Sequence, residues 1–230
     1  MDVNLILTNN SFLYLLQLSN SNLPVGAYSY AEGLETLIDD GVIDTPESLQ
    51  KWLTAELNYG AISMEAGVML RSYTCVIKDE LDTLSYWNHW LSATRESEEM
   101  RASSHQMGGS LLRLLKKIQP QILSLTENIS KPCNYAIAFG ITAALSQIDT
   151  QAATLAYLHS WVTNLVLVGI KLIPLGQTAG QQLLLNLQPS IISTTNKILN
   201  LTDDELSCCN WGVSLASMKH ETQYTRLFRS

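Results

Sequence analysis

Charged residues are scarce in this chain. Asp, Glu, Lys and Arg make up 15% of its 230 residues, against about 25% in a typical globular domain. The hydrophobic class makes up 46%. This apolar share, combined with few charges, suggests that the chain buries more surface than one monomer needs, so we expect interfaces with partner chains. The formal net charge of −7 argues against a nucleic-acid partner and against a membrane partner, although it leaves room for a local basic patch.

Cysteine is also scarce, and its spacing carries no metal or redox signature. The chain has four cysteines, none of them in a CxxC pair: Cys75, Cys133, Cys208 and Cys209. No charged-then-apolar leader opens the chain. We therefore expect reduced thiols and a cytoplasmic protein.

Signals for strands and repeats are absent as well. No pair of alternating segments flanks an Asn-Gly turn, and apolar residues instead recur every three or four positions, as in amphipathic helices. The longest apolar run, 152–170, contains His159 and Asn164, so we interpret it as a buried core helix. The pattern predicts an all-α fold: a single-domain bundle of roughly nine or ten helices over 1–230, with a short lead (1–10) and a tail (about 217–230).

Residues that cap helices mark the expected boundaries. Ser29 with Glu32, and Thr202 with Glu205, have the spacing of a capping box. Small residues dominate 134–148, which predicts a helix that its neighbours can approach closely. Other helices are expected to start at Thr45-Pro46, at Asp79 or Asp82 and at Asp149, and to end at Gly41 and Gly60.

The stretch Lys171–Leu185, KLIPLGQTAGQQLLL, joins two apolar helical runs. Pro174 predicts a kink or a restart there, because it disfavours helical geometry in the residue before it and has no amide hydrogen to donate. We expect helix again from Leu175, and a separate helix around 191–199.

Glycines and glutamines give that stretch two faces. Gly176 and Gly180 are four apart, so in a helix they share one stripe, which predicts the close approach of another backbone. Gln177 and Gln181 form an adjacent polar, uncharged stripe. This combination suits a protein-binding surface better than a reaction centre.

Catalytic and metal-binding motifs are missing. The sequence contains no GxxxxGKS/T or GxGxxG phosphate loop and no HExxH. Its four histidines are scattered, without a carboxylate or cysteine at ligand spacing: His89, His105, His159 and His220. His220-Glu221 beside Cys208-Cys209 leaves a soft-metal site open, but buried thiols and a solvated tail are the favoured interpretation.

Two further sets of charged residues have both a chemical and a structural interpretation. Glu32 and Glu35 could pair as an acid and a base, but we favour a capping Glu32 and an exposed Glu35. Arg95, Arg101 or Arg113 could be an arginine finger lent to a nucleotide hydrolase, but surface or salt-bridge arginines are favoured. We therefore predict a protein that is not an enzyme.

The tail carries an apolar pair, Leu227-Phe228, between Arg226 and Arg229. A free tail rarely keeps such a pair exposed. We favour a tail that docks onto a partner over a tail folded onto its own domain.

Five stretches of the chain form one recognisable pattern, and they are spread along nearly its whole length. They are LLQLSNSNLPVGAYSYAEGLE (15–35), TRESEEMRASSHQMGGSLLRL (94–114), AIAFG (136–140), KLIPLGQTAGQQLL (171–184) and SMKHETQYTRLFRS (217–230). In sequence and in order these stretches resemble the UreF family of urease accessory proteins. The departures from the family pattern, a short lead before Leu15 and the residues Cys208-Cys209-Asn210-Trp211, concern terminal details.

The resemblance implies an all-α homodimer that works in delivering nickel to apo-urease. Such a protein bridges UreD (also called UreH) and the GTPase UreG, and makes nickel insertion depend on GTP. It is implied to have no catalytic turnover and no directly bound cofactor, since nickel and GTP are held by its partners. The alternative function is a GTPase-activating protein that supplies a catalytic arginine to UreG.

The resemblance also implies two sets of interface residues. The tail set, which becomes ordered in a groove of UreD, falls on His220, Tyr224, Arg226, Leu227, Phe228 and Arg229. The GTPase-facing set falls on Tyr30, Glu32, Glu35, Lys171, Gly176, Gln177, Gly180 and Gln181.

Overall fold

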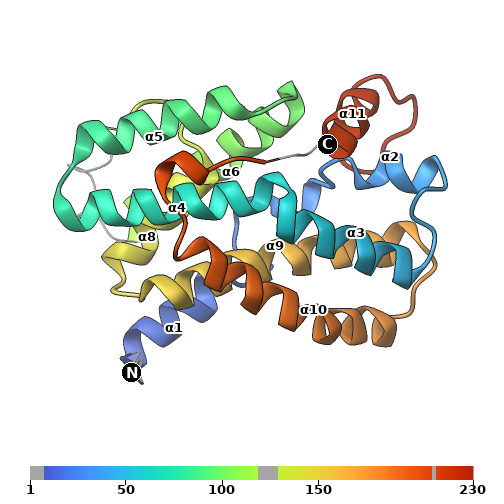
Figure 1. The fold of residues 1–230 in the computed structure, drawn as a ribbon, viewed down its shortest axis with the longest axis horizontal. Coiled ribbons are helices and arrows are strands. Elements are labelled where there is room, and N and C mark those ends of the chain that lie inside the picture. The colour runs from blue at the N-terminus through green and yellow to red at the C-terminus, as the bar shows by residue number, and fades with distance from the viewer. Residues whose placement is uncertain (1–7, 119–128, 209–210, 230) are drawn as a thin grey trace.

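Helices make up the architecture of the chain (Figure 1). The structure, a computed structural model, describes residues 8–118, 129–208 and 211–229. Ten α-helices lie within these residues, which confirms the predicted all-α class. They are α1 (Asn9–Leu18), α2 (Leu34–Asp39), α3 (Pro46–Tyr59), α4 (Ala61–Lys78), α5 (Leu81–Thr94), α6 (Glu98–Ile118), α8 (Tyr135–Leu145), α9 (Thr150–Leu172), α10 (Gln177–Ile198) and α11 (Trp211–His220), with the short 3₁₀ helices η1 (Ala27–Ser29) and η3 (Asp203–Glu205).

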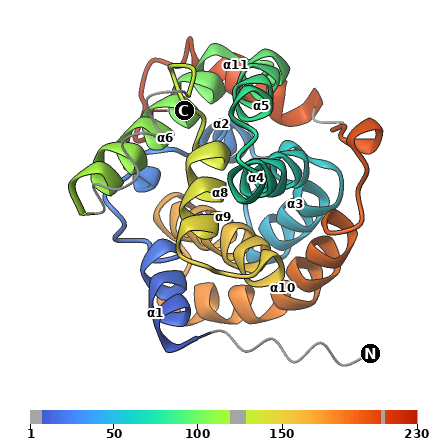
Figure 2. The same ribbon diagram turned by 90° about the vertical axis from the view of Figure 1, so that its left-hand side faces the viewer.

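Helix α8 lies at the centre of the bundle, with α4 and α6 packed against it (Figure 2). All nine residues of 136–144 are buried. A Cβ on Gly140 would lie 2.3 Å from the Met69 carbonyl oxygen of α4, and one on Gly108 of α6 would lie 2.2 Å from the Cys133 carbonyl oxygen. Gly140, one of the small residues predicted for this segment, therefore lets α4 approach at backbone distance, and Gly108 lets α6 approach the residues just before α8.

Helix α9 forms the second layer of the core, packed against α10 and α4. It is the one helix of the described residues that is long and apolar enough to span a membrane, with a mean hydropathy of 1.4 over its most apolar window. In the fold 56% of that window is buried against other helices. Its position agrees with the core role expected for 152–170.

Several predicted boundaries are confirmed. The Thr45 hydroxyl accepts a bond from the Ser48 amide, and Pro46 occupies the first position of α3. An Asp149 oxygen accepts the Ala152 amide at 2.8 Å and caps α9. Gly60 separates α3 from α4. Gly41 follows α2 with a φ of 70°.

Two predicted starts need correction, and a third is confirmed. Ser29 and Glu32 do not cap α2, which begins only at Leu34, because the Glu32 side chain turns inward to bond Trp161. Neither Asp79 nor Asp82 caps α5, since Glu80 is its N-cap residue, and the Glu80 side chain makes no capping hydrogen bond. Thr202 and Glu205 form the expected capping box, but the helix it starts is only the short η3.

The stretch around Pro174 also differs in part from expectation. Helix α9 ends at Leu172 and α10 begins at Gln177, two residues later than predicted. The helix expected around 191–199 is not separate, because α10 continues to Ile198 through Pro189. Pro189 lies on the exposed side of α10, where water can bond the carbonyl that loses its helical partner.

The two glycines of the stretch do not share a helical stripe. Gly176 is the N-cap of α10, and a Cβ on it would meet nothing within 4 Å. Gly180 is helical, and a Cβ there would lie 2.3 Å from Cδ1 of Ile170. The atoms nearest to Gly180 are side-chain atoms of Ile170 and Val166 in α9, so the close approach of another backbone predicted for this pair is made at neither glycine.

We predict that neighbouring glycines of α6 respond oppositely to alanine. Gly108→Ala should lower the free energy of unfolding by about 1–3 kcal/mol, because the new methyl group meets backbone that has no room to move. Gly109→Ala is the matched control, since its Cβ would meet only Arg113 Nη1 at 3.5 Å. It should stabilise by about 0.5–1 kcal/mol through helix propensity. Urea unfolding of both variants measures this, and equal effects would contradict the packing described.

Candidate functional site

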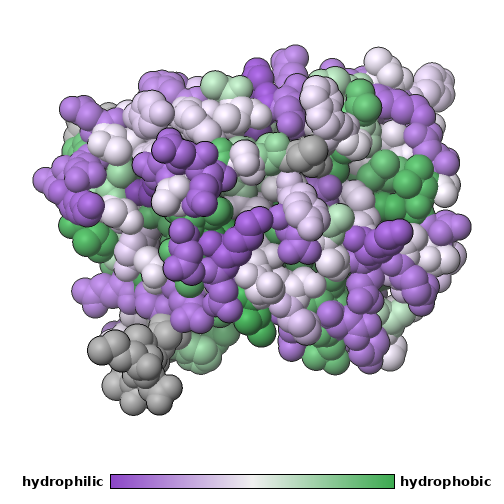
Figure 3. Space-filling model, viewed as in Figure 1, coloured by the Kyte–Doolittle hydropathy of each residue, from purple (hydrophilic) through white to green (hydrophobic). Residues whose placement is uncertain are grey.

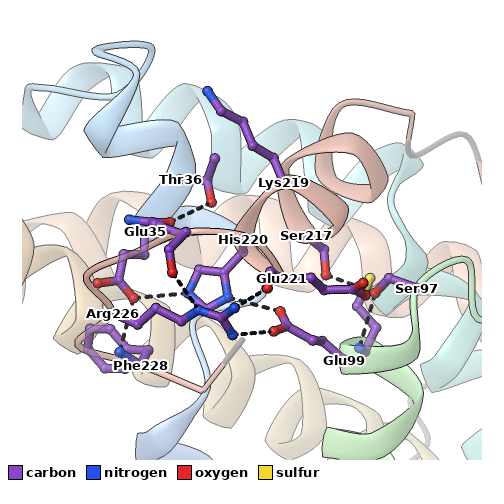
Figure 4. A network of polar contacts seen from close by, with 12 residues as sticks. Glu35, Thr36, Ser97, Glu99, Ser217, Lys219, His220, Glu221, Arg226 and Phe228 are labelled. Carbon is purple, nitrogen blue, oxygen red and sulfur yellow. Dashed lines mark hydrogen bonds and ion pairs between the residues drawn. The ribbon is translucent and has the colours of Figure 1, made fainter.

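The C-terminal segment, defined here as residues 221–229, lies against α2 and α6 (Figure 4). One oxygen of Glu35 accepts the Leu227 amide at 2.6 Å and the other accepts the Phe228 amide at 3.0 Å. The Glu35 residue is 5% exposed, so these two N–H donors satisfy a buried carboxylate. The prediction of an exposed Glu35 is therefore wrong, because the C-terminal segment covers it.

His220 lies between two carboxylates in the same network (Figure 4). It is fully buried, with Nε2 at 3.2 Å from a Glu35 oxygen and Nδ1 at 2.9 Å from a Glu99 oxygen. The other Glu99 oxygen accepts a bond from Arg226 at 2.9 Å. No histidine has a carboxylate at ligand spacing in the sequence, and the two carboxylates that His220 contacts in the fold come from residues more than a hundred positions away.

The apolar pair of the tail is split between the interior and the solvent. Phe228 is 6% exposed, and Lys171 Nζ lies 5.4 Å from the centroid of its ring. Arg229 donates its amide to the Ser29 carbonyl. Leu227 is 65% exposed. The tail in this structure is folded onto its own domain through its backbone and Phe228, with one apolar side chain left outside.

The structure brings together only part of the predicted GTPase-facing set. Glu35 and Lys171 meet at the C-terminal segment, as described above. Tyr30 and Glu32 lie instead on the wall of an internal cavity. The other four are at the start of α10, where Gly180 is buried and the rest are exposed: Gly176, Gln177 and Gln181.

The internal cavity holds a buried polar network that the sequence patterns did not indicate. Glu65 pairs with Arg95 Nη1 at 2.5 Å and accepts the Tyr157 hydroxyl at 3.1 Å. Glu32 accepts the Trp161 indole N–H at 2.8 Å. One available signal was that Glu65 is the only acidic residue of α4 and lies within its mostly apolar first half, 61–70.

Burial changes the titration of this network. The pKa of Glu32 is raised from 4.5 to about 7, chiefly by burial and next by the charge of the nearby Glu65, while the Trp161 bond and Arg95 act to lower it. Burial, followed by the Glu65 charge, also raises the pKa of Tyr157 well above its usual value. Glu32 therefore changes charge near neutral pH.

The three arginines that could act as an arginine finger differ in how far their side chains are exposed to a partner. Arg95 is held inside by Glu65. Arg101 bonds the carbonyls of Ser92 and Arg95. Arg113 alone of the three is exposed, with one bond to a neighbouring serine of α6.

A soft-metal site near the tail gains no support from the geometry. Among the described residues, no group of three His, Cys, Asp or Glu side chains could hold a metal ion. Cys208 lies 4.0 Å from a Glu96 oxygen, and Cys209 is outside the described residues. His220 has its two ring nitrogens bonded to Glu35 and Glu99.

We predict a pH-dependent stability that belongs to Glu32. Between about pH 4.5 and pH 7 the native state keeps a proton on Glu32 that the unfolded chain has released, so the stability from this group falls as pH rises through that window. The free energy of unfolding of the wild type minus that of Glu32→Gln should therefore decrease across the window. Denaturant titrations at several pH values measure the difference. Glu47→Gln, at an exposed position of α3, is the control, and a difference for Glu32→Gln that does not vary with pH would contradict the prediction.

Comparison with known proteins identifies the family. The family model described as UreF matches residues 43–188. The urease accessory protein UreF of Trichormus variabilis is 65% identical over 224 residues, which cover 97% of this chain and 98% of that protein. The proteins of the same name from Microcystis aeruginosa (51% identical, 98% of this chain and 100% of that protein) and Chromohalobacter salexigens (34% identical, 94% and 93%) also match. This chain belongs to the UreF family of urease accessory proteins.

Proposed function

We propose that this protein is a non-catalytic scaffold of urease maturation. It acts in the cytoplasm as a homodimer and bridges a UreG-type GTPase and a UreD/UreH-type protein, so that nickel enters apo-urease only when GTP is used. Nickel and GTP are held by the partners. The observation that carries the proposal is a C-terminal segment fixed through its backbone, which leaves Tyr224 and Leu227 facing outward.

The C-terminal segment is suited to docking onto another protein. Three contacts hold it on its own domain. The backbone N–H of Leu227 donates a hydrogen bond to Glu35, the Phe228 ring is buried, and Arg226 donates to Glu99. Tyr224 is fully exposed and Leu227 is 65% exposed, although both side chains bury well at interfaces. We assign this surface to the UreD/UreH-type partner.

The first turn of α10 is the proposed contact for the GTPase. Gln177 and Gln181 are one turn apart and exposed, and the exposed Gly176 leaves space beside them. The molecular surface seen in Figure 3 mixes polar and apolar residues in small patches. A polar contact of this kind needs only to favour one nucleotide state of the GTPase to couple hydrolysis to assembly.

A substitution at Leu227 should disrupt partner binding without disturbing the fold of the C-terminal segment. Leu227→Asp should abolish co-purification with the UreD/UreH-type partner, because a charge replaces an exposed apolar contact while the backbone bonds to Glu35 stay in place. Deleting 224–230 should have the same effect and leave the dimer intact by size-exclusion chromatography. Thr225→Asp, also exposed, is the control for added charge. Retention of the partner by Leu227→Asp and by the truncated protein would overturn this assignment.

The α10 prediction concerns the GTPase. The double variant Gln177→Ala/Gln181→Ala should bind the UreG-type protein about tenfold or more weakly, since it removes two polar contacts. Its helical content by circular dichroism should equal that of the wild type. Gln188→Ala, exposed on the same helix, should bind normally. An unchanged affinity of the double variant would move the GTPase contact elsewhere.

A further inference from the structure

A second feature, independent of the proposed function, is the internal cavity of about 70 Å³. Its lining combines polar side chains, here called the polar wall (Glu32, Glu65, Arg95 and Trp161), with apolar ones such as Leu23 and Met107. The lining also includes exposed residues at 20–21, so a small molecule has a route in from solvent. A cavity of this size has room for several water molecules or for a ligand of a few heavy atoms.

Two groups on the polar wall have unused hydrogen-bonding capacity. Arg95 Nε–H is buried without a partner among the described residues, and the Arg95 side chain is only 6% exposed. Glu32 uses one oxygen for Trp161, and its other oxygen bonds to none of the described residues. Buried donors are nearly always satisfied in native proteins, by protein groups or by water, so we infer that an occupant of the cavity, water or a ligand, accepts from Arg95.

The backbone holds Glu32 in place against its own preference. Glu32 has a φ of 50° and Gly33 a φ of 78°, so two consecutive residues are left-handed just before α2. Strain of this kind in a residue other than glycine is concentrated at ligand sites. Here it turns the Glu32 carboxylate towards the cavity and away from the helix start where a capping role was expected.

The charge balance selects the kind of ligand. Above the Glu32 pKa of about 7, which is the pH range for the titrations below, Glu65 neutralises Arg95 and the ionised Glu32 is the remaining charge on the wall. An anion is therefore repelled, and a cation offers nothing to the Arg95 donor. We propose that the cavity is a binding site for a small neutral primary amide, whose carbonyl oxygen accepts from Arg95 Nε–H and whose NH₂ group donates to Glu32.

Three probes of one shape test the proposal: acetamide, acetate and acetamidinium, which are neutral, anionic and cationic. The indole N–H of Trp161 bonds Glu32 directly, so its cross-peak in a ¹H–¹⁵N spectrum reports on the site. The chain has five tryptophans, and Trp161→Phe identifies the peak. Acetamide should shift the Trp161 cross-peak saturably. Each charged probe should bind about tenfold or more weakly, because acetate cannot donate to Glu32 and acetamidinium cannot accept from Arg95.

A substitution at Glu32, in the polar wall of the cavity, provides a second test of the proposal. Glu32→Gln keeps an acceptor for Trp161 but replaces the free oxygen with NH₂, so acetamide should bind about tenfold or more weakly. Glu47→Gln should bind as the wild type does. Tighter binding of acetate or acetamidinium than of acetamide would overturn the ligand class, and no saturable shift with any probe would show a cavity that holds only water. The wild-type titrations decide these outcomes even if Glu32→Gln does not fold.

Discussion

The contact of α4 and α6 with the α8 region through glycine is the constraint on which the other features depend. Met69 of α4 opposes Gly140, and Gly108 of α6 opposes the Cys133 carbonyl, at distances that admit no side chain. Because these contacts fix the position of α6, they also fix Glu99 at its first turn, where it bonds His220. The surface that holds the C-terminal segment is thus positioned by the packing of the core.

Segment 29–35 connects the cavity to the C-terminal segment. On its inner side Glu32 bonds Trp161 of α9. On its outer side Glu35 bonds the amide of Phe228, and the Ser29 carbonyl accepts the next amide. The candidate cavity site and the candidate docking surface therefore share seven residues of backbone, so a shift of this segment alters both.

The sequence predicted features that depend on neighbouring residues. Thr45 caps its helix as expected, because its bond partner is three residues away. Glu35 and His220 were misjudged, because their surroundings come from chain segments more than a hundred residues apart. The UreF resemblance supplied the family, which the comparisons show, whereas the residues assigned to each partner stay predictions. No spacing rule could have placed Arg95 beside Glu65, since that pair depends on how α4 meets the end of α5.

Because Glu32 has a left-handed backbone conformation, the residue that is best for thermostability at this position differs from the residue that the cavity site needs. Glycine would adopt a φ of 50° without strain, and asparagine would do so more easily than glutamate. Replacing Glu32 with either residue relaxes the backbone and also removes a buried ionisable group. A laboratory selection for thermostability alone would therefore favour such replacements, and the enriched clones would have lost the carboxylate that gives the cavity its chemistry.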